Sequence, residues 1–168
     1  MTTTETIRKR RSVRKYRSDE KIPQKDIQLI LEAAMMAPSA CNSRPWEFIV
    51  INSDEMKQQI TQIHPYAKHL KDAAIGILVC GLPDLQQGKS EGFWPQDCAA
   101  ATQNILLQAT ELGYGTCWCG VYPKTNLTES FQKLLNITSM PVSLITIGVS
   151  EDEPAPRGFY DETKVKSI

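Results

Sequence analysis

The fold is best indicated by residues 95–121, PQDCAAATQNILLQATELGYGTCWCGV. This stretch predicts a buried helix followed directly by a core strand. Small and apolar side chains go most of the way round a helix over residues 95–112. A helix with so little polar surface is buried, either at the centre of a domain or against another subunit. Gly113 and Gly115 end this helix, and residues 116–121 then predict a strand.

Further helices and strands are predicted on both sides of this stretch. Strands are predicted over residues 46–51, 74–80 and 142–149, and the second is apolar throughout, which predicts burial on both faces. Helices are predicted over residues 3–9, 24–36 and 126–135, and another starts near Ser53, an N-cap followed by two acids. The sequence therefore predicts one domain, residues 1–168, of α+β architecture with one sheet between helices. Residues 150–168 lack a core pattern, so this tail either hangs free or lies on another surface.

The composition is that of an ordinary globular protein, with 168 residues, 41% hydrophobic and 23% charged. Its apolar runs are too short to span a bilayer, and the N-terminus lacks a signal-peptide pattern. Five cysteines without regular spacing argue against a disulfide framework and favour a reducing, cytoplasmic location. Cys117 and Cys119 are predicted to share one face of a core strand. Neither His64 nor His69 is near a cysteine pair in the sequence, so no metal site is predicted.

Charge is concentrated near the N-terminus. Residues 8–17 contain seven cations and no acid, whereas the remaining residues contain 12 cations against 19 acids. An acidic remainder argues against a wide nucleic-acid-binding face. In an extended segment, Arg10, Ser12 and Arg14 project to the same side, where two guanidinium groups and a hydroxyl can bind one phosphate. A solvated basic loop or a local nucleic-acid patch is the alternative interpretation.

Three other segments are candidates for a binding site, each with an ordinary alternative. Residues 37–46, APSACNSRPW, form a loop that exposes backbone groups and the Asn42 amide, but they also suit a simple helix-to-strand connection. The glycines that flank residues 116–119 let a flat ligand approach the backbone, but they also suit a helix end and a core strand. Arg157 lies alone in the tail, where an arginine is usually solvated.

Together, these segments resemble the nitroreductase family of FMN-dependent oxidoreductases. The resemblance rests on the order of RRSVRKY, APSACNSRPWEF, QDCAAATQNILLQATELGYGTCWCGVYP and IGVSEDEPAPRGFYDE, and it extends over essentially the whole chain. It implies an α+β sandwich whose central, mostly antiparallel sheet is flanked by helices. It also implies an intertwined homodimer with FMN at the interface and an exchanged C-terminal tail.

The resemblance also implies which residues bind FMN. The phosphate and ribityl chain would be held by Arg10, Arg11, Ser12, Arg14 and Arg157, which explains the basic run better than nucleic acid does. The loop of the other subunit would reach the flavin, and the glycine-rich strand would lie along its ring. These positions correspond to Pro38, Ser39, Ala40, Asn42, Trp118, Cys119 and Gly120.

The implied reaction passes hydride from NADH or NADPH to FMN and then to a small oxidised acceptor, such as a nitroaromatic or a quinone, in a ping-pong cycle. The cofactor carries this chemistry, so we predict no catalytic side chain. A specialised relative that breaks down flavin, reduces enones or dehalogenates is an alternative, as is a flavin store or sensor. Arg44 stands where the family usually has glutamine, either to favour an anionic acceptor or to face solvent.

Overall fold

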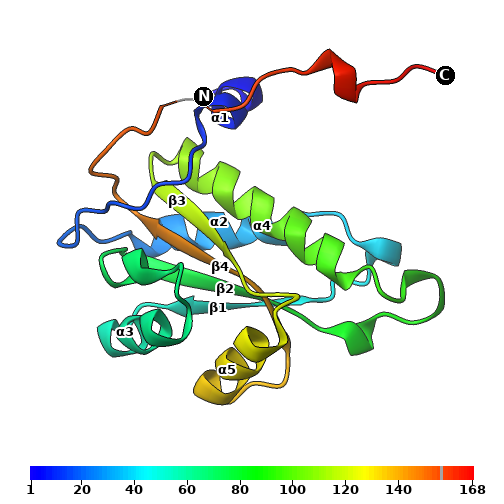
Figure 1. The fold of residues 1–168 in the computed structure, drawn as a ribbon, viewed down its shortest axis with the longest axis horizontal. Coiled ribbons are helices and arrows are strands. Elements are labelled where there is room, and N and C mark those ends of the chain that lie inside the picture. The colour runs from blue at the N-terminus through cyan, green and yellow to red at the C-terminus, as the bar shows by residue number, and fades with distance from the viewer. Residues whose placement is uncertain (156) are drawn as a thin grey trace.

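The computed structural model describes residues 1–155 and 157–168, which form an α+β fold (Figure 1). In these residues, five helices and four strands follow one another in this order: α1 (Thr3–Lys9), α2 (Gln24–Met35), β1 (Trp46–Ile51), α3 (Asp54–Ile63), β2 (Ile75–Gly81), α4 (Trp94–Glu111), β3 (Gly115–Gly120), α5 (Thr125–Leu135) and β4 (Met140–Gly148). The predicted elements are confirmed, with boundaries that differ by no more than two residues.

The four strands form one antiparallel sheet in the order β1-β2-β4-β3. Helices α2 and α4 pack on one face and α3 and α5 on the other, so that two apolar cores sandwich the sheet (Figure 1). Strand β2 is buried along its whole length, as its unbroken apolar sequence predicts. Strands β2 and β4 thus form the buried centre of the sheet, and β3 is an edge strand beside which other segments can lie.

Local sequence signals set the ends of the helices. Thr2 and Glu5 form a reciprocal capping box at the start of α1, and the Ser53 hydroxyl accepts a hydrogen bond from the backbone of Met56 at the start of α3. Helix α4 stops before Gly113, whose φ of 90° lies in the left-handed region that favours glycine.

Helix α4 is only partly buried within its own chain. One side contributes Cys98, Ala101 and Ile105 to the core between the helices and the sheet. Ala99, Ala100 and Leu107 on the rest of the surface are only partly buried. The chain by itself therefore leaves an apolar strip on α4 that intramolecular packing does not fully cover.

The C-terminal tail runs away from the sheet and ends far from it (Figure 1). Beyond Ser150 every described residue is exposed or only partly buried, including Phe159 at 88% and Tyr160 at 79% exposure. Aromatic side chains with so much exposed area are costly in water and typical of surfaces that bind another chain. The tail thus has few partners in its own chain.

Candidate functional site

The basic N-terminal segment lies beside the edge strand β3. Ser12 forms a parallel bridge with Thr116, and the Val13 N–H donates to the Thr116 carbonyl at 2.8 Å. Tyr16 anchors the segment from behind, because its hydroxyl donates to the Val13 carbonyl at 2.8 Å and lies 2.8 Å from Thr146 Oγ1. Two segments that are about a hundred residues apart in the sequence are thereby joined into one surface.

Close contact between the basic segment and β3 depends on Gly115. A Cβ atom at this position would lie 2.8–2.9 Å from three atoms of Val13, closer than such atoms approach in proteins. The sequence suggested that both glycines flanking this strand admit a flat ligand. Gly115 instead accommodates Val13, so only Gly120 is left for that role.

Side chains of the basic segment alternate over residues 12–14 as an extended backbone requires, and the alternation ends at the buried Tyr16. Val13 is buried, whereas Ser12 and Arg14 are exposed and Arg10 is partly buried. Since Arg10, Ser12 and Arg14 have the same parity, their polar groups can converge on one anion at the surface. This side of the segment is the candidate phosphate site.

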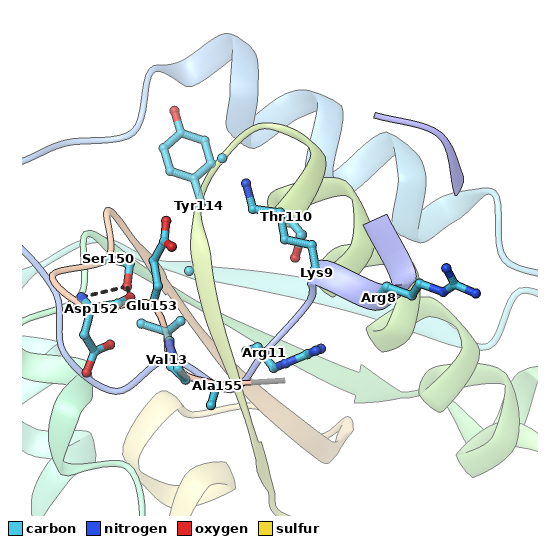
Figure 2. Close-up of a pocket in the computed structure, with 13 residues that line it drawn as sticks. Arg8, Lys9, Arg11, Val13, Thr110, Tyr114, Ser150, Asp152, Glu153 and Ala155 are labelled. Atoms are coloured by element: carbon cyan, nitrogen blue, oxygen red, sulfur yellow. Dashed lines mark hydrogen bonds between the residues drawn. The ribbon is translucent and has the colours of Figure 1, made fainter. Parts of the chain in front are cut away.

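The opposite side of the segment borders a cavity of about 320 Å³ (Figure 2). Arg8, Lys9 and Arg11 line it, but so do Asp152 and Glu153 at the start of the tail. Two carboxylates disfavour a bound phosphate. Arg11 Nη1 is also engaged, since it donates to the Arg10 carbonyl at 2.6 Å, and its buried Nε has no hydrogen-bond partner among the described residues. The cavity is therefore a poorer phosphate site than the exposed side.

The far end of β3 presents an open, flat surface. Trp118 is 38% exposed, Gly120 is exposed, and a Cβ atom added at Gly120 would have no neighbour within 4 Å among the described residues. Below it, His64 accepts a hydrogen bond at Nδ1 from the Tyr66 N–H, so its Nε2 donates to the Gly120 carbonyl at 3.1 Å. Burial lowers the pKa of His64 and keeps this histidine neutral.

The predicted loop after α2 is held in an unusual conformation. Cys41, Asn42 and Arg44 have φ values of 50°, 54° and 48°, a region that side chains other than glycine seldom adopt. Ser39 Oγ accepts from the Arg44 N–H at 2.9 Å, and Arg44 Nε donates to Asn42 Oδ1 at 3.2 Å. Several uncommon backbone conformations in four residues are typical of a site that must present groups in fixed directions.

Two residues that the sequence analysis did not single out hold this loop. Asp97, in the first turn of α4, accepts from the Ala40 N–H at 3.1 Å and from Gln86 Nε2 at 2.7 Å. Gln86 Nε2 also donates to Ser43 Oγ at 3.0 Å. Both Asp97 and Gln86 are buried. Asp97 was the sequence signal that could have predicted this contact. It stands at the start of an apolar helix, and a buried carboxylate needs hydrogen-bond donors nearby.

The two halves of the candidate site lie at opposite ends of α4. The loop containing Ala40 is tied to its first turn, and the basic segment adjoins Gly115, just beyond its last turn. Eighteen helical residues span about 27 Å. The loop and the basic segment of one chain therefore do not form one compact pocket, and Arg157 is an exposed residue of the tail.

Cys117 and Cys119 lie on the buried face of β3, as predicted. The fold also brings His69 to them, with its Nε2 3.8 Å from Cys119 Sγ. The neighbouring Cys119 thiol lowers the pKa of Cys117, with a further contribution from His69. The neighbouring Cys117 and burial raise the pKa of Cys119. Distance in the sequence concealed this cluster, because His69 reaches it from the connection between α3 and β2.

Comparison with known proteins identifies the family. The nitroreductase family model matches residues 7–76 and 64–149, so this chain belongs to the nitroreductase family. A protein of Methanothermobacter thermautotrophicus named "Putative NADH dehydrogenase/NAD(P)H nitroreductase" is 43% identical over 163 residues, which cover 96% of this chain and 84% of that protein.

Solved structures agree with this assignment. A crystal structure from Parabacteroides distasonis that bears the same name has a TM-score of 0.91 at 35% identity, and the match covers 98% of this chain and 96% of that one. An FMN-dependent nitroreductase from Clostridium difficile has a TM-score of 0.87 at 29% identity, with 96% of each chain covered. The predicted α+β nitroreductase fold is thus confirmed. No helix in residues 1–155 or 157–168 is both long and apolar enough to cross a membrane.

Proposed function

We propose that this chain is an FMN-dependent oxidoreductase that takes hydride from NADH or NADPH and delivers it to a small oxidised acceptor. The observation that carries the proposal is the Ser12–Thr116 bridge, which brings the row of Arg10, Ser12 and Arg14 to the edge strand β3, whose far end at Gly120 is open. Names of similar proteins, which include NAD(P)H nitroreductases and an FMN-dependent nitroreductase, support the same function.

The residues of the site suit the parts of FMN. Arg10, Ser12 and Arg14 offer charge-assisted hydrogen bonds to a phosphate, with Arg157 from the tail as a further ligand. The open surface at Gly120 leaves room for a flat ring, and the backbone N–H groups near Cys119 and Gly120 can stabilise negative charge on it. Bound FMN would supply the hydride transfer, and the protein would bind and orient it.

We further propose that the site is completed in a homodimer. Pro38, Ser39, Ala40 and Asn42 of one protomer would approach the ring held by the basic segment of the other. The partly exposed strip on α4, together with exposed apolar residues on α2 and in the tail, supplies area for a partner to cover. A two-fold axis would use the same surfaces twice and allow the two tails to exchange.

Anaerobic titration of the purified protein tests the activity. We expect one FMN per chain and loss of its absorbance on addition of NADH or NADPH, followed by recovery on addition of a nitroaromatic or a quinone. An acceptor screen on the reduced protein, run with each nicotinamide, then defines the specificity. Flavin that neither nicotinamide reduces would make the protein a flavin store or sensor and overturn the proposed reaction.

The phosphate site is tested by substitution. Ser12→Ala and Arg14→Ala remove polar groups on the exposed side, and each lost hydrogen bond to a charged group costs about 1.5–3 kcal/mol. Arg17→Ala is the matched control, because this nearby exposed arginine pairs with Glu20 at 3.6 Å. Retention of full FMN content by both site variants would show that the phosphate binds elsewhere.

A further inference from the structure

The buried face of β3 carries a group of potential metal ligands that the proposed reaction does not use. His69, Cys117 and Cys119 each offer one ligand atom, and the three atoms lie within 4.8 Å of one another. We propose that this cluster is a binding site for Zn²⁺. The sequence-based expectation of no metal site rested on the separation of these residues along the chain, and the fold removes that separation.

The spacing of the three atoms fits zinc. Zn–S bonds of about 2.3 Å and Zn–N bonds of about 2.0–2.1 Å place tetrahedral ligand atoms about 3.5–3.8 Å apart. The 3.8 Å between Cys119 Sγ and His69 Nε2 is about 0.2–0.3 Å longer than the S–N separation, about 3.5–3.6 Å, that these bonds give. The largest separation in the cluster needs a contraction of at most about 1.3 Å, which rotation of the thiol and imidazole side chains can provide.

The chemical character of the ligands selects the ion. Two thiolates and an imidazole are soft or borderline donors, which favour zinc and disfavour magnesium or calcium. Their charge of −2 neutralises Zn²⁺ in a site where Cys117 and Cys119 are buried. Three protein ligands leave the fourth position for water, and the half-buried His69 provides a path from solvent.

Tyr16 and Tyr66 lie beside the cluster. The Tyr16 ring lies 6.2 Å from that of His69, but its hydroxyl is directed to Val13 and Thr146. The other close partner of Cys119 is the Tyr66 carbonyl, 3.8 Å from the sulfur. The Tyr16 hydroxyl is thus already engaged by its own hydrogen bonds.

Zinc at this site would join two parts of the fold. Cys117 and Cys119 belong to the edge strand β3, whereas His69 lies in the 3-10 turn Lys68–Lys71. The ion would tie the strand that carries the open flavin surface to the connection between α3 and β2. We therefore expect zinc to stabilise the fold, whether or not the protein turns over a substrate.

Titration of the complete, metal-free protein with Zn²⁺ against a chromophoric chelator measures the affinity and stoichiometry. We expect one Zn²⁺ per chain, with release of protons from the thiols. Co²⁺ should add sulfur-to-cobalt charge-transfer absorption, recorded as a difference from the metal-free sample. At free Zn²⁺ one hundred times its Kd, the melting temperature should rise by about 5–10 °C.

Two ligand variants and two thiol controls test which residues bind. Cys117→Ser and His69→Asn should each weaken zinc binding by about 100-fold or more and abolish the thermal shift. Cys98→Ser and Cys41→Ser, one buried thiol and one exposed thiol outside the cluster, should keep both. His69 is half-buried, so its variant tests the site even where the strand substitution prevents folding.

Three outcomes would overturn the zinc site: no stoichiometric binding by the unmodified protein, undiminished binding by both ligand variants, or equal loss in the Cys98 control. All of these readouts are independent of flavin reduction. The zinc site and the proposed reductase activity can therefore fail separately.

Discussion

Gly120→Ala tests whether the glycine at this position is required for FMN binding rather than for folding. An added Cβ atom at this exposed position has no neighbour within 4 Å among the described residues, and Gly120 is not one of the glycines with positive φ. The substitution should therefore leave the fold of the flavin-free protein intact. Alanine also restricts the unfolded chain more than glycine does, so the expected change in stability is zero to about +1 kcal/mol.

The same methyl group should weaken FMN binding. If the flavin ring lies against the backbone at Gly120, the methyl group occupies part of its space, and overpacking of this kind costs about 1–3 kcal/mol. The dissociation constant for FMN should then rise about 5- to 150-fold. Gly92→Ala is unsuitable as a control because its φ of 82° would strain alanine, so Arg17→Ala serves as the surface control.

Two assays on the same sample give the answer. Urea denaturation of the flavin-free protein gives its stability, and fluorescence titration with FMN gives its affinity. Unchanged FMN affinity in a normally folded Gly120→Ala protein would show that the ring does not lie on this end of β3. A large loss of stability would instead show that Gly120 is packed in the solution structure.

Further substitutions test the scaffold around the site. Gly115→Ala should destabilise the protein by about 1–3 kcal/mol in urea denaturation, because its methyl group would overlap Val13; unchanged stability would contradict this packing. Asp97→Asn should cost about 1–3 kcal/mol, because the neutral amide accepts weaker hydrogen bonds from Ala40 and Gln86 than the carboxylate does and replaces one acceptor oxygen with an NH2 group; unchanged stability would contradict its role in holding the loop. His64 has a pKa below its ordinary value of 6.5, so the unfolded chain binds its proton more readily. Stability should therefore fall as the pH drops through 6.5, and His64→Gln should show a shallower decline in thermal denaturation; equal slopes would exclude this contribution.

Local patterns in the sequence were sufficient to predict the helices and strands. The small and apolar residues of α4, the continuous apolar run of β2 and the Ser53 cap each act over short distances along the chain. These features follow from the geometry of one helix or one strand.

Contacts between distant segments could not be predicted in the same way. The bridge from Ser12 to Thr116, the contact of Gly115 with Val13 and the approach of His69 to Cys119 all depend on the path of the chain between elements. Gly115 shows the consequence, since a glycine that admits a ligand and one that admits a neighbouring side chain have the same sequence signature. Composition also could not show which side of α4 is buried within one chain and which strip that chain leaves uncovered.

A crystal structure of the protein with FMN bound would locate the phosphate and the ring together. We expect the phosphate between Arg10, Ser12 and Arg14, the ring along Trp118–Gly120, and the loop containing Ser39 and Asn42 contributed by a second protomer. A phosphate bound instead in the cavity lined by Arg8, Lys9 and Arg11, or a flavin site completed by a single chain, would contradict the account.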